Sequence, residues 1–142
     1  MSATTIEAEV LEASSAKTAS STGTTAIGGR GEFRAAEFEL DVTVSDTDAG
    51  DTLDVFIQTT IDGTNWLDVV HFTQVIGTDT AKRFVAKIVG TLAEAMYEVA
   101  SALAAGSVRH ILGKRYRARW DLVDAGADNA SFTFSITANF IP

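Results

Sequence analysis

The chain has 142 residues with no cysteine and one proline, and its formal net charge is −8. This length suits one domain, and a hydrophobic fraction of 46% argues against general disorder. The lack of cysteine excludes a disulfide framework, a Cys-ligated metal centre and a thiol nucleophile. The acidic charge opposes binding to nucleic acid, because phosphates repel it.

No apolar run is long enough for a transmembrane helix, so no membrane contact is expected. Residues 1–10 lack the basic and apolar regions of a secretory signal. We therefore expect the protein to be made in the cytoplasm.

The N-terminal quarter differs in composition from the rest. Residues 13–31 are almost all Ala, Ser, Thr and Gly, and Ile27 is the one large apolar side chain among them. Such a segment buries too little surface to order itself. The sequence therefore predicts an arm over residues 1–32, ordered only against a partner or the domain surface, and a folded domain over residues 33–142. A short strand over residues 6–11 is the one element considered within the arm.

From residue 33 onward, apolar and polar side chains alternate, which is typical of half-buried strands. The alternation predicts strands over residues 38–45, 53–60, 66–73 and 84–88. Asp62 and Gly63 lie between two of these runs, and glycine accepts the positive φ of a hairpin turn. Residues 53–60 and 66–73 are therefore expected to form a hairpin.

The clearest alternation lies near the C-terminus. In residues 115–123, Tyr116, Ala118 and Trp120 share one face and the arginines share the other. In residues 131–141, apolar side chains alternate with hydroxyl and amide groups, so one face of the strand is apolar and the other polar. This pattern indicates long antiparallel strands, because strands of parallel sheets are buried on both faces.

Residues 91–105 depart from the strand pattern. Thr91 and Glu94 fit a helix capping box, and apolar residues such as Met96 and Val99 recur at helical spacing. Gly106 would end this helix. A strand over residues 95–100 is the competing interpretation, and the helix is slightly favoured.

These elements predict an all-β, mainly antiparallel fold, with one short helix at about residues 91–105. Many short strands with polar turns and no β-α-β rhythm indicate a β-sandwich, jelly-roll-like in character.

Arginines form the most distinctive polar pattern in the chain. Arg115, Arg117 and Arg119 share one face of a predicted strand and suit carboxylate or phosphate groups. We expect them to form ion pairs with another strand or to contact a subunit, since the net charge disfavours nucleic acid. The acidic partners considered on another strand are Glu37, Glu39 and Asp41. Arg30 and Arg34 complete the candidate interaction residues.

The turn Asp46–Asp51 loosely resembles a calcium loop. It fails the EF-hand pattern because Ala49 and Ile57 occupy ligand positions. A solvated acidic turn is the favoured interpretation, and another kind of calcium site remains open.

Catalytic and metal-binding patterns are otherwise absent from the sequence. His71 and His110 lie in no metal-binding motif, so neither is expected to bind a metal. No nucleophile, base and orienting group stand in a recognised pattern. The sequence therefore predicts neither an enzyme nor a cofactor.

The tryptophans allow two interpretations. Trp66 and Trp120, with Phe56 and Tyr116, suit a sugar-stacking platform on a carbohydrate-binding module. Filling the core of a sandwich is the favoured alternative, because large aromatic side chains dominate protein cores.

Several segments resemble a family of small β-proteins encoded in the structural gene clusters of tailed phages and prophages. The run Leu53–Trp66 followed by His71-Phe72-Thr73-Gln74 is similar to that family's strand, Asp-Gly turn, Trp and short strand ending in Phe-x-Gln. Arg117-Ala118-Arg119-Trp120 and Ser131–Ser135 match its two C-terminal strands, and residues 13–20 resemble its Ser/Thr/Ala lead-in. The resemblance covers roughly residues 5–141.

The resemblance implies a structural role in the virion. A decoration protein that binds the major capsid protein and stabilises the head lattice is the first expectation, and a tail or neck component is the next. Such a protein is expected to form a homo-oligomer, with a trimer favoured, and to contact other virion proteins.

Overall fold

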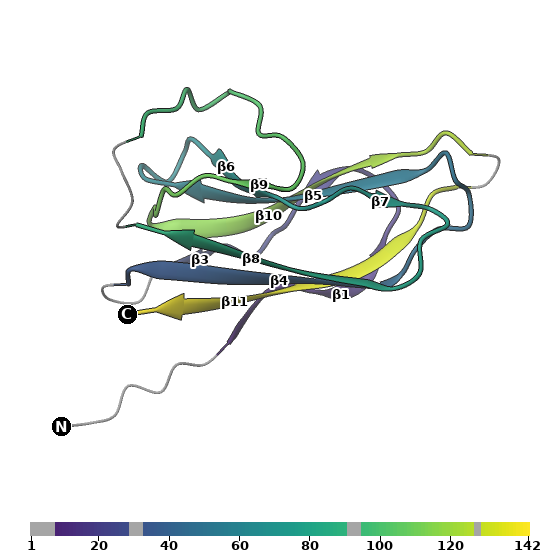
Figure 1. Cartoon of the computed structure of the whole chain (residues 1–142), viewed down its shortest axis with the longest axis horizontal. Helices are drawn as coiled ribbons and strands as arrows, with labels where there is room; N and C mark the ends of the chain where they lie inside the picture. The colour runs from purple at the N-terminus through teal and green to yellow at the C-terminus, as the bar shows by residue number, and fades with distance from the viewer. Residues whose placement is uncertain (1–7, 29–32, 91–94, 127–128) are drawn as a thin grey trace.

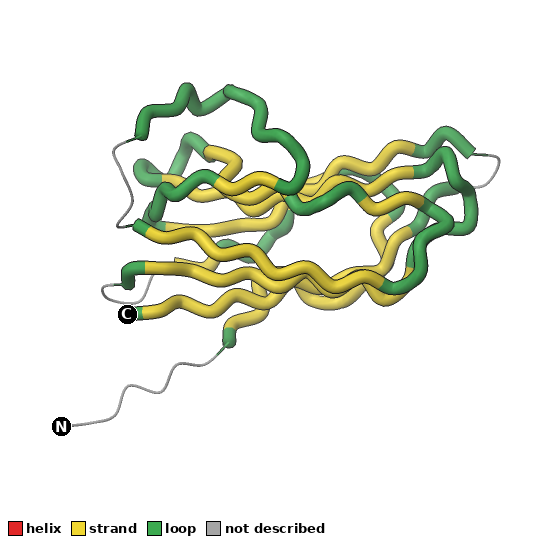
Figure 2. Tube along the Cα trace, viewed as in Figure 1, coloured by secondary structure: helices red, strands yellow, loops and turns green. Residues whose placement is uncertain are grey.

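Two packed β-sheets form the protein (Figure 1). The computed structural model describes residues 8–28, 33–90, 95–126 and 129–142. Within this part of the chain every regular element is a strand, and none is a helix (Figure 2). The prediction of an all-β antiparallel sandwich is confirmed.

The smaller sheet has four strands in the order β1-β11-β4-β8. Its strands are β1 (Glu9–Lys17), β4 (Ala35–Val44), β8 (Lys82–Val89) and β11 (Phe132–Ile141). The larger sheet has seven strands, with the main order β2-β10-β5-β6-β9. Its strands are β2 (Ser21–Thr22), β3 (Ile27–Gly28), β5 (Thr52–Thr60), β6 (Leu67–His71), β7 (Val75–Ile76), β9 (Ser107–Val108) and β10 (Arg115–Val123).

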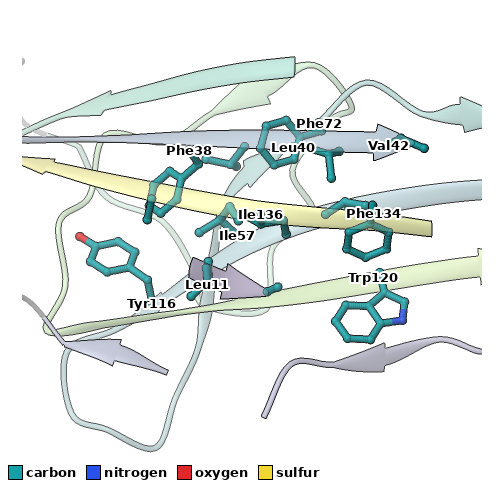
Figure 3. Packing of buried hydrophobic residues seen from close by; sticks show 14 of the residues in the cluster. Leu11, Phe38, Leu40, Val42, Ile57, Phe72, Tyr116, Trp120, Phe134 and Ile136 are labelled. Carbon is teal, nitrogen blue, oxygen red and sulfur yellow. The ribbon is translucent and has the colours of Figure 1, made fainter. Parts of the chain in front are cut away.

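The core lies between the two sheets and follows the predicted alternation (Figure 3). Trp120 of β10 meets Phe134 of β11 edge to face, with ring centroids 5.6 Å apart. Towards the other end, Phe38 of β4 packs against Tyr116 of β10 at 5.6 Å. The favoured interpretation, core filling, is therefore correct for Trp120 and Tyr116. Burial raises the pKa of the Tyr116 phenol to about 12.

The described part of the predicted arm pairs with the rest of the domain in both sheets, and the short strand considered over residues 6–11 overlaps β1 at residues 9–11. Strand β1 pairs with β11 along the edge of the smaller sheet, while β2 and β3 pair with β10 in the larger one. Leu11 is fully buried, and the Lys17 ammonium lies 4.9 Å from the Trp120 ring. Main-chain pairing needs no large side chain, so a segment poor in apolar residues can still form edge strands.

The helix predicted for residues 91–105 is wrong in its described part. Residues 95–106 form loop and turns, and the competing strand over 95–100 is absent too. Thr91 and Glu94, the predicted cap, lie outside the described residues. Met96 is 95% exposed, so the apolar stripe finds no surface to bury. An isolated helix of this length is marginal in water without such packing.

Side chains hold this loop instead of helical hydrogen bonds. Arg109, which is 5% exposed, donates to the Ser101 carbonyl at 3.1 Å and to the Ala102 carbonyl at 2.8 Å. His71 Nδ1 lies 2.7 Å from the Leu103 carbonyl oxygen. Three consecutive carbonyls are thus hydrogen-bonded to side chains from elsewhere in the fold, which fixes the loop against β6 and β9.

The hairpin predicted around Asp62-Gly63 is confirmed, since β5 and β6 pair antiparallel and Gly63 has a φ of 86°. Asp62 Oδ1 accepts hydrogen bonds from the backbone amides of Thr64 and Asn65, both at 2.8 Å. These two hydrogen bonds hold the pKa of Asp62 well below its ordinary value, and the bond from Asn65 has the larger effect.

Candidate interaction surface

The side chains of Arg117 and Arg119 on β10 lie on the outer face of the larger sheet, at the centre of a network of polar and aromatic side chains. Register places Arg117 opposite Gln58 and Arg119 opposite Phe56 on β5. Gln58 in turn lies opposite Asp68 on β6. Outward-facing side chains from three neighbouring strands therefore meet here.

Arg119 is the most heavily engaged residue of the network. Its guanidinium donates to Asp68 at 3.1 Å and to Asp121 at 2.8 Å, and it lies 3.8 Å from the centre of the Phe56 ring. Burial disfavours the charge of Arg119, but the hydrogen bonds to the two carboxylates outweigh burial and raise its pKa.

Arg117 is held by groups without charge. Its Nε donates to Gln58 at 2.8 Å, and its guanidinium covers the Trp66 ring at 4.2 Å. Burial and the neighbouring charge of Arg119 lower the pKa of Arg117. Arg119 thus forms ion pairs within its own chain, with Asp68 and Asp121 rather than with the predicted carboxylates, whereas Arg117 bonds to Gln58.

The predicted partners belong to the other sheet. Glu39 and Asp41 lie on β4 and form ion pairs with Arg83 of β8, at 3.4 and 3.0 Å. Glu37 accepts a hydrogen bond from Asn139 at 3.0 Å. Sequence spacing does not reveal that β10 pairs with β5 rather than with β4, and so it identified the wrong acidic strand.

Two of the remaining candidate arginines are exposed at one end of the sandwich. Arg115 begins β10 and Arg34 precedes β4, and neither side chain has a polar partner among the described residues. The Arg34 backbone amide donates to the Ile141 carbonyl at 2.8 Å. Arg30 lies outside the described residues. The four predicted residues that the structure describes therefore do not form one cluster.

An open apolar groove lies at the same end, between the β5–β6 hairpin and residues 95–99. Its volume is about 490 Å³. Met96 and Ile61, which are 95% and 66% exposed, lie beside the half-buried Leu67, and Asp62 and Asn65 add polar groups to the lining. The sequence analysis missed this groove because it assigned Met96 to the face of a helix.

Arg109 stabilises one wall of the groove. Besides its bonds to the loop carbonyls, its guanidinium lies 4.8 Å from the ring of Tyr97, which also lines the groove. The sequence analysis did not single out Arg109.

The tryptophans do not form an open stacking platform. Trp120 is 6% exposed, and its indole nitrogen donates to the Ala19 carbonyl at 3.0 Å. Trp66 lies outside the core, with one face of its ring covered by Arg117. Trp120 therefore has no free face for a sugar, and one face of Trp66 is already covered.

Both histidines make hydrogen bonds within the protein. His71 Nε2 lies 2.8 Å from Asp54 Oδ1, and its Nδ1 faces the Leu103 carbonyl. Among the described residues, this histidine therefore hydrogen-bonds to no serine or threonine hydroxyl that it could activate as a nucleophile. His110 Nδ1 accepts from the backbone amide of Val89 at 2.9 Å. The acidic turn is different, because the structure brings Asp46, Asp48 and Asp51 together.

The fold and surface define an antiparallel β-sandwich protein with an exposed apolar groove at one end. No family model matches the chain, and no curated protein and no solved structure is significantly similar to it. The described residues contain no helix able to cross a membrane.

Proposed function

We propose that this protein is a non-catalytic structural component of a tailed-phage particle, and specifically a decoration protein that binds the major capsid protein on the head. The observation that carries the proposal is the exposed groove around Met96 and Ile61. The resemblance of the Leu53–Trp66 run to phage structural proteins supports the same role.

The groove suits a protein partner. Single exposed apolar residues are ordinary, but a contiguous apolar surface with polar groups at its margin is typical of an interface. Arg34 and Arg115 are exposed at this end of the sandwich and add positive charge there. Carboxylates of a capsid subunit would pair with these arginines around an apolar contact.

The arginine network suits a rigid module rather than a ligand site. Arg117 and Arg119 are engaged by side chains of their own sheet, so a ligand would have to break existing hydrogen bonds to reach them. A decoration protein needs a stable body and a docking surface, and it needs no reacting groups.

Repetition of copies on the lattice explains how a small groove suffices. A capsid presents many identical sites, and an oligomer engages several of them at once. We propose a homo-oligomer, with a trimer as the form that matches three-fold positions of a head lattice. The proposed location is the virion, without contact to nucleic acid or membrane.

The test is co-sedimentation of the purified full chain with separated heads and tails of the phage that encodes it. Heads without the protein should bind it saturably, and isolated tails should not. Light scattering after size exclusion should report a trimer. Binding to tails alone would favour the alternative, a tail or neck component, and contradict the decoration role.

A further inference from the structure

The opposite end of the sandwich carries an acidic cluster at the turn between β4 and β5. Asp46, Asp48 and Asp51 each present a carboxylate oxygen, and these oxygens lie within 4.8 Å of one another. Acidic turns are common at protein surfaces, so this spacing alone does not define a binding site.

Asp51 distinguishes this cluster from an ordinary turn. Its side chain is fully buried, and Oδ1 accepts from the backbone amides of Ala125 at 2.8 Å and Gly126 at 2.7 Å. Oδ2 is also buried but has no hydrogen-bond donor. A buried carboxylate oxygen without a donor is costly, more so beside a second carboxylate. A bound cation removes both costs.

The other carboxylates are positioned by the backbone. Asp46 Oδ2 accepts from the Asp48 amide at 3.1 Å, and Asp46 Oδ1 accepts from the Ser131 amide at 3.3 Å. Each carboxylate oxygen has two lone pairs, so an oxygen that accepts one N–H can still bind a cation.

Two glycines fix Asp48 from either side. A Cβ on Gly77 would lie 2.0 Å from the Asp48 carbonyl oxygen, and a Cβ on Gly126 would lie 2.5 Å from Asp48 Oδ2. The cluster is therefore assembled from three turns that pack against one another, and its geometry is set before any ligand arrives.

We propose that Asp46, Asp48 and Asp51 form a calcium site. An all-oxygen set of three carboxylates suits a hard cation, and the cluster contains no histidine or cysteine for zinc. Ca²⁺ accepts irregular sets of six to eight oxygens, whereas Mg²⁺ requires near-octahedral geometry. Three carboxylates, with water molecules as the remaining ligands, can supply the irregular oxygen set that Ca²⁺ accepts. All three ligands belong to the β4–β5 turn, so the ion would hold this turn in one conformation.

The experiment is calorimetric titration of CaCl₂ and of MgCl₂ into the full chain after treatment with EDTA, with thermal melts in both states. We expect one Ca²⁺ per chain with a Kd between about 10⁻⁵ and 10⁻³ M, and weaker Mg²⁺ binding. With Ca²⁺ at about 100 times Kd, the Tm should rise by roughly 5–10 °C.

Variants distinguish Ca²⁺ binding at this site from a general attraction of Ca²⁺ to a negatively charged protein. Asp51→Asn keeps an oxygen for the Ala125 and Gly126 amides, so it should remain folded while Ca²⁺ affinity falls by roughly 100-fold or more. Asp46→Asn should also weaken Ca²⁺ binding, but it gives up one of the two backbone hydrogen bonds of Asp46, so Asp51→Asn is the main test. Asp124→Asn removes one exposed charge from the neighbouring turn and should keep wild-type affinity.

Three results would overturn the proposal. The first is the absence of saturable heat and of any Tm change in the wild-type chain with millimolar Ca²⁺, a result that needs no variant. The second is an equal response in wild type and Asp51→Asn. The third is a preference for Mg²⁺.

Discussion

The two ends of the sandwich are built in opposite ways. At the acidic end, turns pack backbone against backbone, with Gly77 and Gly126 closing on Asp48. At the groove end, the loop over residues 95–106 is held by side chains, mainly Arg109, and leaves Met96 exposed. Close backbone packing leaves no space for a larger side chain at Gly77 or Gly126. Side-chain anchoring leaves an open surface, which is what a docking partner requires.

The largest expected effect lies at the acidic end. Gly77→Ala places a Cβ where the Asp48 carbonyl oxygen lies, so the backbone must shift, and we expect a loss of about 3 kcal/mol in unfolding free energy. Gly28→Ala is the control, because its Cβ would meet the nearest atom at an ordinary 3.8 Å. Chemical denaturation of both variants measures the difference. Equal losses would show that the two ends are packed alike.

Loss of the anchor at the groove end should have a smaller effect. Arg109→Ala removes the hydrogen bonds to Ser101 and Ala102, and we expect a loss of about 2 kcal/mol. Amide exchange should accelerate at Ser101 and Gly106 in this variant while β10 stays protected. Arg115→Ala, at an exposed arginine, is the control. Unchanged exchange at Gly106 would contradict the anchoring role of Arg109.

The stability of the β5–β6 hairpin, which lies beside the groove, should decrease at acidic pH. Folding lowers the pKa of Asp62. The ionised Asp62 carboxylate therefore stabilises the folded state at pH values above its pKa in the unfolded chain, which is about 3.9, and this stabilisation is lost as the pH falls through the pKa in the folded state. Carboxyl ¹³C shifts should show Asp62 titrating below the other aspartates. Asp62→Asn should remove this part of the acid sensitivity. Titration of Asp62 near 3.9 would contradict the geometry of the turn.

The smallest effect on stability is expected at the groove itself. Met96→Ser combined with Ile61→Ser should change the unfolding free energy by less than about 0.5 kcal/mol, because both side chains are largely exposed. The matched control is Val10→Ser combined with Val85→Ser, at exposed valines of the smaller sheet. A large loss in the groove variant alone would mean that the groove is packed in the isolated protein.

Sequence periodicity identified the elements whose structure depends on their own side chains. Residues 115–123 were predicted as a strand and form β10 with the same bounds. Alternation fixes which face of such a strand is buried, so it also identified Tyr116 and Trp120 as core candidates. The β5–β6 hairpin was predicted for a similar reason, because an Asp-Gly turn acts locally.

The remaining features depend on contacts between distant segments. Residues 95–106 carry a helical pattern, but their carbonyls bind Arg109 and His71. Strand β1 is specified by main-chain pairing with β11, which composition does not reveal. The partners of Arg119 depend on the order of strands in the larger sheet. In each case the deciding group lies far away in sequence.

The most direct test of the account is a head-binding assay that compares the groove variant with its matched control. The account predicts that the chain carrying Met96→Ser and Ile61→Ser stays in the supernatant. The chain carrying Val10→Ser and Val85→Ser should sediment with the heads as wild type does. If the groove variant sediments as fully as the control, the apolar end is not the docking surface and the central claim fails.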